Sequence, residues 1–367
     1  KPEPELRADE AKAIQTIIDI FKGYKQSEIL DETVWNTIKS DIKDAEALVA
    51  DETSLSKDIK ALRKQMESYT ATVTEEIDRT ATRNGLKESI DYCKSLKEGD
   101  YSNKDTFAKL ADAITTAEKA YTNVSDTRLN YKAARDILEK VRVALVKNVS
   151  TESSDPKTFR ILDKKTVIKE MGAGINLGNT MDGGLYDSSE TGWQAYKTTK
   201  DYIKALHDAG YNTVRIPVTW GSHINDDYTI DEAWINRVQE IVDYCVDQDM
   251  YAIVNIHHDG AANHDDRGNN TPACWLDTYS QNIEKVYQKY EGVWNTIANR
   301  FKDYDEHVIF ESMNEVTDAH GTATNEDDAV LNALNQLFIN TVRATGSNNT
   351  KRWLAITGRF ATTAAIT

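Results

Sequence analysis

The segments YAIVNIHH (251–258) and HVIFESMNE (307–315) decide the fold class. Each is a short apolar run that ends in polar side chains, which is typical of a buried strand with a polar carboxyl end. Three other segments share this pattern: AGINLG (173–178), NTVRIP (212–217) and RWLAITG (352–358). Amphipathic helical stretches separate the five segments, and this alternation predicts βαβ units on a parallel sheet. We therefore predict an α/β fold with a parallel sheet from residue 159, with about five strands in this chain. A (β/α)8 TIM barrel and a doubly wound sheet both fit this pattern.

The preceding part of the chain, from Ala8 to about Val149, has a different pattern and predicts helices only. Its apolar residues recur at helical spacing. The pattern repeats at an offset of 72 residues, in the pairs Ile14 and Leu86, Ile18 and Ile90, Trp35 and Phe107, and Ile42 and Ile114. Each copy has three helical segments, so we expect two all-α three-helix bundles, residues 1–79 and 80–149. A linker containing Ser, Asp and Pro (150–158) then leads to the barrel part, 159–367.

The composition excludes several classes of function. The net charge of −16 argues against a nucleic-acid partner and against an anionic membrane surface. No window of 18 apolar residues predicts a membrane span. Three widely spaced cysteines, Cys93, Cys245 and Cys274, cannot form a closed disulfide framework, so we expect buried thiols. No G-x-G-x-x-G or Walker sequence follows a strand, which argues against a nucleotide cofactor.

Four blocks occur in order on successive predicted strands: GINLGNTMD (174–182), NTVRIPVTW (212–220), VNIHHDG (254–260) and FESMNE (310–315). Together they resemble glycoside hydrolase family 5, most closely its cellulase-type members, over about residues 160–360. The resemblance implies that the fold is a (β/α)8 TIM barrel. The resemblance implies that Glu315 is the general acid/base and that Asn314 binds the 2-hydroxyl of the sugar. It also implies that Arg215 steadies the nucleophile and that His257 lines the catalytic subsite. Val316 stands where the family commonly has proline.

Glu311 and Glu315 lie on the same predicted strand but are expected to differ in role. A strand rises about 3.3 Å per residue, so these two side chains are separated by about 13 Å. The two catalytic carboxyl groups of glycosidases are only about 5 to 9.5 Å apart. Glu311 is therefore too deep to be the second catalytic acid. We expect it to be a buried structural carboxylate, with Arg215 on a neighbouring strand as its candidate partner.

Other side chains at the strand ends are candidates for binding sugar. Indole faces stack on the apolar surface of pyranose rings. The candidates are Trp193, Trp220 and Trp275, in or beside the loops after the first three strands, together with His258 and Asn179. Trp220 is the strongest of the three tryptophans because it directly follows a strand. The loop 257–270 is dense in Asp, Asn and His but lacks ordered ligand spacing, so we expect no metal and no cofactor.

The resemblance implies a retaining, endo-acting hydrolase that cleaves β-1,4-glucan polysaccharide and is secreted or displayed on a bacterial surface. The family's nucleophilic glutamate lies on strand 7, so we expect it beyond residue 367. Asp259 is a weaker candidate for that role. The open explanations are a fragment of a longer enzyme, a second chain that completes the barrel, and a shortened inactive relative. The functional alternatives are a non-catalytic carbohydrate-binding or adhesion protein and a β-mannanase or xyloglucanase.

The second helical repeat, which begins LKESIDYCKSLKEGDY (86–101), resembles the FIVAR module, and the first repeat resembles a more diverged copy. This family occurs beside catalytic domains in bacterial surface and secreted proteins. The helical repeats contain no constellation of catalytic side chains. We therefore expect them to act as a spacer, a stalk or a weak binding module.

Overall fold

The computed structural model describes residues 1–367 except 153, 184–188, 261–273, 279–281, 317–324 and 362–367. It divides into two compact units. The first unit comprises Lys1–Asp91 and Ala113–Leu138, and the second comprises Tyr92–Asp112 and Glu139–Thr367. The boundary between compact units therefore does not follow the predicted domain boundary at 149/150.

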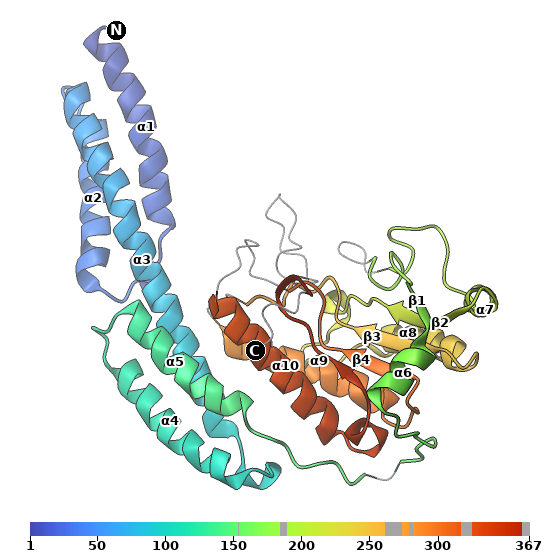
Figure 1. Cartoon of the computed structure of the whole chain (residues 1–367). Helices are drawn as coiled ribbons and strands as arrows, with labels where there is room; N and C mark the ends of the chain where they lie inside the picture. The colour runs from blue at the N-terminus through green and yellow to red at the C-terminus, as the bar shows by residue number, and fades with distance from the viewer. Residues whose placement is uncertain (153, 184–188, 261–273, 279–281, 317–324, 362–367) are drawn as a thin grey trace. The chain divides into compact units, whose positions relative to one another are not determined.

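The first unit is all-helical, as predicted (Figure 1). Helices α1 (Glu3–Gly23) and α2 (Glu32–Ala50) pack with the first part of α3 (Ser56–Ser95). Their shared core contains Ile14, Ile18, Phe21, Val34, Ile38, Ile59 and Met66. Asp31 caps α2 by accepting the Thr33 N–H at 2.7 Å, which satisfies one of the free amides of the first turn.

Helix α3 continues without interruption through residues 79 and 80, where two separate helices were expected. Between Gly23 and Gly85 the sequence contains neither glycine nor proline, so no residue there terminates the helix. Helices α4 (Lys104–Thr122) and α5 (Arg128–Val143) follow it. Within the first unit, the Arg83 guanidinium lies 3.9 Å from the centre of the Tyr121 ring and ties α3 to α4.

The second unit contains a parallel sheet of five strands in the order β1-β2-β3-β4-β5, as predicted. The strands are β1 (Ala173–Asn176), β2 (Tyr211–Ile216), β3 (Tyr251–Asn255), β4 (Val308–Glu311) and β5 (Leu354–Ala355). The helices are α6 (Lys164–Met171), α7 (Lys200–Asp208), α8 (Glu232–Val246), α9 (Ile283–Phe301) and α10 (Asn325–Ala344). Short 3₁₀ helices occupy Gln26–Glu28, Glu98–Asp100, Gly221–His223, Ser347–Thr350 and Arg359–Ala361.

The two faces of the sheet have different neighbours. Val214, Val254 and Phe310 point to the outer face, where they share one core with α7, α8, α9 and α10. Tyr251 and Ile309 point to the inner face and contact Val167 of α6. Because side chains alternate along a strand, Arg215, Asn255 and Glu311 also lie on the inner face, at its carboxyl edge.

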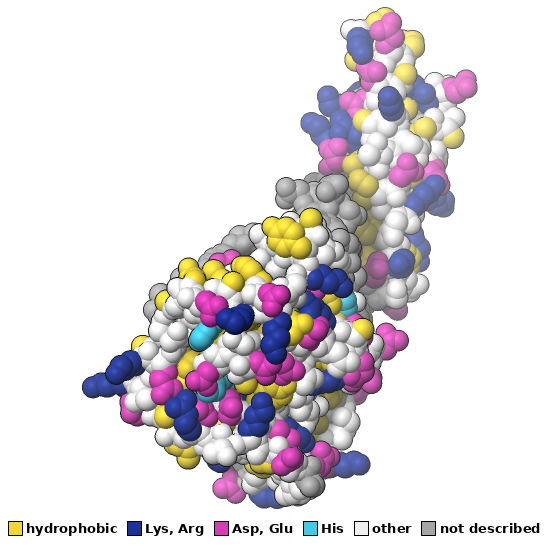
Figure 2. Space-filling model, turned by 90° about the vertical axis from the view of Figure 1, so that its right-hand side faces the viewer, with side chains coloured by type: hydrophobic (Ala, Val, Ile, Leu, Met, Phe, Trp, Pro, Cys, Tyr) yellow, Lys and Arg dark blue, Asp and Glu magenta, His cyan; other side chains and the backbone are white. Residues whose placement is uncertain are grey.

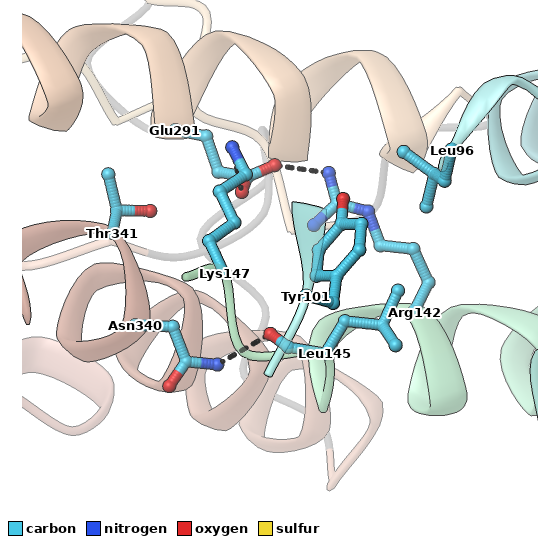
Figure 3. A pocket seen from close by; sticks show the side chains of 8 residues that line it. All are labelled: Leu96, Tyr101, Arg142, Leu145, Lys147, Glu291, Asn340 and Thr341. Carbon is cyan, nitrogen blue, oxygen red and sulfur yellow. Dashed lines mark hydrogen bonds and ion pairs between the residues drawn. The ribbon is translucent and has the colours of Figure 1, made fainter. Parts of the chain in front are cut away.

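A buried ion cluster joins the end of α5 to helix α9 within the second unit (Figure 3). Arg142 donates from Nε to Glu284 Oε1 at 3.1 Å and also bonds Glu291, which lies 3.5 Å from Lys147 Nζ. Asn340 of α10 donates to the Leu145 carbonyl at 3.1 Å. Residues 139–150 are therefore anchored on α9 and α10.

One face of the molecule shows how the charged side chains are distributed. On the face drawn in Figure 2, basic and acidic side chains are interspersed among the residues described. The three cysteines are free thiols and buried, as predicted. Of the helices that the structure describes, none is long and apolar enough to cross a membrane.

Candidate active site

Arg215 and Glu311 form a two-pronged ion pair at the carboxyl edge of the inner face. Arg215 donates from Nε to Glu311 Oε2 at 2.7 Å and from Nη2 to Oε1 at 2.5 Å. The hydrogen bond to Glu311 raises the pKa of Arg215 above its ordinary value, so the guanidinium stays charged. The predicted pairing of these two residues is confirmed, but their strands are not neighbours, because β3 lies between β2 and β4.

The same guanidinium also contacts two asparagines. Arg215 Nη2 donates to Asn314 Oδ1 at 3.1 Å, and Nη1 donates to Asn176 Oδ1 at 3.2 Å. The Asn314 N–H donates to the Ile256 carbonyl at 2.7 Å, which fixes the backbone just after β4. The next residue, Glu315, has an exposed side chain. Asn314, which Arg215 contacts, and Glu315 therefore follow the end of β4 at the carboxyl edge, where the sequence predicted them.

Asn255 links this ion pair to His257. Its side chain is fully buried, and its Nδ2 lies 3.1 Å from Glu311 Oε1 and 3.2 Å from His257 Nδ1. Its Oδ1 accepts the Val218 N–H at 3.2 Å. Burial lowers the pKa of His257 to about 3, with smaller contributions from His258 and Arg215 in the same direction. His257 is therefore neutral at ordinary pH.

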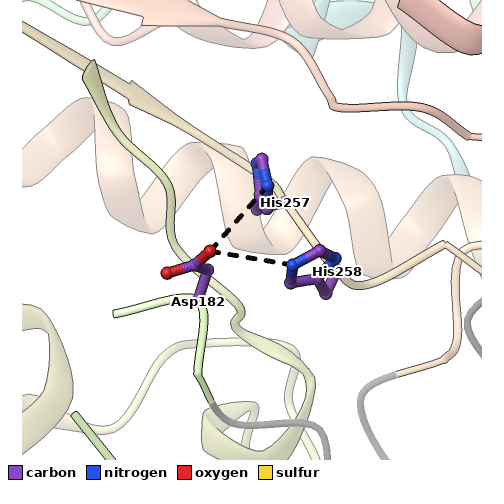
Figure 4. Close-up of side chains that lie close together, drawn as sticks. All are labelled: Asp182, His257 and His258. Atoms are coloured by element: carbon purple, nitrogen blue, oxygen red, sulfur yellow. Dashed lines mark ion pairs between the residues drawn. The ribbon is translucent and has the colours of Figure 1, made fainter. Parts of the chain in front are cut away.

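Asp182 faces both histidines (Figure 4). Its Oδ2 lies 3.7 Å from His258 Nε2 and 4.0 Å from His257 Nε2. Burial opposes ionisation of Asp182, but contacts that include His258 hold its pKa below the ordinary value. Asn179, three residues before Asp182, has a left-handed backbone (φ 61°) and is exposed. These histidines and Asp182 offer three possible ligand atoms within 4.8 Å of one another.

The three predicted tryptophans lie in different environments. Trp220 is 0% exposed, and its indole N–H donates to the Asn255 carbonyl at 2.9 Å. It is a core residue and cannot stack on a sugar, which corrects the prediction for this residue. Trp193 is 43% exposed, and its ring meets the His258 ring edge-on at 5.4 Å between centres. Trp275 is half-buried, with Lys289 Nζ 4.9 Å from its ring centre.

Asp259 is fully buried beneath two of these tryptophans. Its carboxylate accepts the Trp220 backbone N–H at 3.1 Å and the Trp275 indole N–H at 2.7 Å. Burial raises the pKa of Asp259 to about 6. These contacts make Asp259 a structural acceptor between two loops, so it is not placed to serve as a second catalytic carboxylate.

Three polar residues of the site were not assigned a role from the sequence: Asn176, Asp182 and Asn255. Asn176 and Asn255 are inward-facing residues at the ends of β1 and β3. The two-residue period of a strand, extended back from His257, would have indicated Asn255. Residues 261–270, which make up most of the predicted loop 257–270, lie outside the described residues.

The match to the cellulase family, described as glycosyl hydrolase family 5, spans residues 174–364. The cellulase/esterase CelE of Acetivibrio thermocellus is 42% identical over 205 residues, which are 53% of this chain and 23% of that protein. Endoglucanase A of Paenibacillus barcinonensis is 40% identical over 206 residues, 54% of this chain and 49% of that protein. The solved structure of ZgEngAGH5_4 in complex with a cellotriose is 36% identical, has a TM-score of 0.51 and covers 57% of this chain and 60% of its own.

The chain thus spans about half or less of the length of these two curated relatives. The family match covers more than half of the 367 residues and includes all five strands except the first residue of β1. Arg215, His257, Asn314 and Glu315, the residues to which the resemblance assigned catalytic roles, all lie within it. This chain belongs to the cellulase family, glycosyl hydrolase family 5.

Proposed function

We propose that this protein is an endo-acting glycoside hydrolase that cleaves β-1,4-linked glucan with retention of configuration. The observation that carries the proposal is the network from Arg215 to Glu311 and Asn314. It holds the Asn314–Glu315 pair at the carboxyl edge of a parallel sheet, beside a neutral histidine. In barrels of parallel strands, active sites form at this edge. Membership of the cellulase family supports the same reaction class.

In the proposed reaction, Glu315 is the general acid and then the general base. A carboxylate nucleophile attacks the anomeric carbon as the glycosidic C–O bond breaks, and Glu315 gives its proton to the leaving oxygen. Glu315 then takes a proton from water, and the resulting hydroxide displaces the nucleophile from the sugar. Asn314 binds the 2-hydroxyl, and this hydrogen bond strengthens as positive charge develops on the sugar ring.

The nucleophile is assigned to a residue outside this chain, on a completed (β/α)8 barrel. The described carboxylates nearest to the site support this assignment because each has another role. Glu311 is bound by Arg215, Asp259 is buried under Trp275, and Asp182 faces two histidines. Arg215 is proposed to steady the nucleophile with the part of its guanidinium that faces Asn176 and Asn314.

The remaining predicted contacts are proposed as sugar-binding groups. Trp193 offers an exposed indole, while His258 and Asn179 offer polar atoms at the same edge of the sheet. Trp275 can contribute only the part of its ring that Lys289 leaves uncovered. Because polysaccharides do not enter cells, we propose that the enzyme acts outside the cell, secreted or on the surface. The helical repeats are proposed to be FIVAR-like spacers.

Substitution of the proposed acid/base tests this function. In the full-length protein, Glu315→Gln should reduce the release of reducing sugar from β-1,4-glucan by at least about 100-fold, because proton transfer contributes about 10²–10⁴-fold. Binding of cello-oligosaccharide, measured by calorimetry, should change little. Glu52→Gln, an exposed glutamate of the first unit, is the matched control and should leave both unchanged. Oligosaccharide binding without any hydrolysis by the unsubstituted protein would instead favour the adhesion alternative.

A further inference from the structure

We infer that Asn255 is a positioning residue that fixes His257 in the tautomer protonated at Nε2. In this form, His257 presents an N–H donor, and not a lone pair, at the carboxyl edge of the sheet. The assignment of the tautomer follows from hydrogen bonds within the site. The use of that donor to bind substrate rests on the proposed function.

The orientation of the Asn255 amide is fixed by its two neighbours, Val218 and Glu311. The Val218 N–H lies 3.2 Å from one amide atom, and a Glu311 carboxylate oxygen lies 3.1 Å from the other. The Val218 N–H can only donate, and an ionised carboxylate can only accept. A flipped amide would place NH₂ against N–H and C=O against carboxylate, so both contacts would be lost. Since Asn255 is fully buried, water cannot replace them, and Nδ2 must face Glu311.

The orientation of Asn255 determines whether His257 Nδ1 carries a proton. This nitrogen lies 3.2 Å from Asn255 Nδ2, which has hydrogens to donate but no lone pair with which to accept. Nδ1 must therefore be unprotonated to accept this bond. His257 is neutral because burial lowers its pKa to about 3, so its single proton resides on Nε2.

The Nε2–H of His257 has no acceptor within hydrogen-bond distance among the described residues. Asp182 Oδ2 lies 4.0 Å away, which favours a proton on Nε2 electrostatically but is too long for a hydrogen bond. Among the residues that the structure describes, Nε2 has no hydrogen-bond partner, and 12% of the side chain is accessible. The donor is therefore available to a hydroxyl or ring oxygen of a bound sugar.

The same tautomer disfavours a metal ion at Asp182, His257 and His258, although their ligand atoms lie close together. A metal ligand must offer a lone pair, and a metal-bound histidine usually donates its other ring N–H to an acceptor. For His257, binding through Nε2 would require an Nδ1–H directed at the Asn255 NH₂ group. These residues therefore do not fit a metal ion.

The test is the protonation of each ring nitrogen, measured by long-range ¹H–¹⁵N correlation on protein labelled at its seven histidines. His257 is assigned by its loss in His257→Gln. We expect a pyridine-type Nδ1 and a pyrrole-type Nε2 between pH 5 and 8. His223 provides an internal contrast, since its Nδ1 lies 2.7 Å from Asp231 Oδ2 and must carry a proton. A pyrrole-type Nδ1 at His257 would overturn the inference.

Asn255→Asp should switch the tautomer. The carboxyl oxygen in place of Nδ2 lies against Glu311 Oε1, so it holds a proton that it donates to Glu311, and its lone pair accepts from His257 Nδ1–H. Unchanged signals for His223 verify that the variant is folded, and the exposed Asn295→Asp on α9 is the matched control. An unchanged His257 tautomer in folded Asn255→Asp would contradict the positioning role. Cello-oligosaccharide binding should weaken about 3- to 10-fold, as for loss of one hydrogen bond. If the unsubstituted protein binds no such sugar, the proposed function fails while the tautomer result still stands.

Discussion

Two arginines of the second unit each hold buried glutamates, but the two clusters are built differently. Arg215 donates from Nε and Nη2 to the two carboxylate oxygens of Glu311, and Asn255 donates a third hydrogen bond to the same carboxylate. Arg142 divides its donors between Glu284 and Glu291. Among the described residues, Glu284 Oε2 has no hydrogen-bond partner. The first cluster is fully bonded at its carboxylate, whereas the second leaves one oxygen unsatisfied.

This difference gives the clusters different properties. A fully bonded carboxylate fixes the geometry around it, which suits a site where Asn314 must be placed accurately. A buried carboxylate with an unsatisfied oxygen prefers to hold a proton. Burial accordingly raises the pKa of Glu284 to about 8, while Arg142 and Lys147 keep the pKa of Glu291 below its ordinary value. We expect the Arg215 cluster to govern activity and the Arg142 cluster to govern stability and its dependence on pH.

The largest expected effect is the loss of stability in Arg142→Met. Removing this cation leaves Glu291, whose side chain is 13% exposed, without its main partner, and breaking an ion pair of a buried arginine costs about 3–5 kcal/mol. The measurement is urea denaturation followed by tryptophan fluorescence. Arg63→Met, which breaks the more exposed ion pairs with Glu10 and Glu67 in the first unit, is the control and should cost about 1 kcal/mol. Equal losses in the two variants would mean that burial of the Arg142 cluster adds no stability.

Arg215→Lys should affect activity much more than stability. Lysine keeps the charge but cannot bond both Glu311 oxygens and Asn314 at once. We expect the proposed hydrolysis to lose about 100-fold in kcat/KM, as for a displacement of about 1 Å at a reacting group. The urea midpoint should move less than in Arg142→Met. A variant that loses stability without losing activity would reverse the roles assigned to the two clusters.

Glu284→Gln should change how stability depends on pH. The folded-state pKa of Glu284, about 8, lies above the ordinary value of 4.5, so between these pH values the folded protein retains a proton that the unfolded chain releases. Its contribution therefore falls as pH rises, by up to about 1.4 kcal/mol per pH unit. Denaturation at pH 5, 6.5 and 8 should show the variant gaining stability relative to the unsubstituted protein. Parallel curves would mean that Glu284 is ionised throughout.

Asn176→Ala should have the smallest effect. Asn176 accepts a single 3.2 Å bond from Arg215 at an exposed position, whereas Glu311 accepts two bonds. We expect a stability change below about 1 kcal/mol and a kcat/KM within about 5-fold of the unsubstituted enzyme. A loss as large as that of Arg215→Lys would show that Glu311 alone does not orient the guanidinium.

Much of the fold and part of the site followed from sequence pattern. The five strands and the pairing of Arg215 with Glu311 depend on strand periodicity and the cost of a buried charge, and both can be read locally. The prediction that Trp220 binds sugar is wrong. Its position after a strand suggested an exposed ring, but its indole N–H donates to a backbone carbonyl of β3, which holds the ring in the core. Sequence pattern does not predict the Arg142 cluster, because the two glutamates that bind Arg142 lie 142 and 149 residues away along the chain. Which distant helix receives a side chain depends on tertiary packing.

The anchoring of residues 139–150 on α9 and α10 has a consequence for recombining this protein with others. A chimaera joined at the linker, after residue 149, would replace Arg142 and so leave Glu284 and Glu291 facing an unrelated side chain. A junction before Glu139 would transfer the cation together with the two acids that need it. The second unit of this protein is therefore transferred intact only when Glu139–Thr367 is kept together with Tyr92–Asp112.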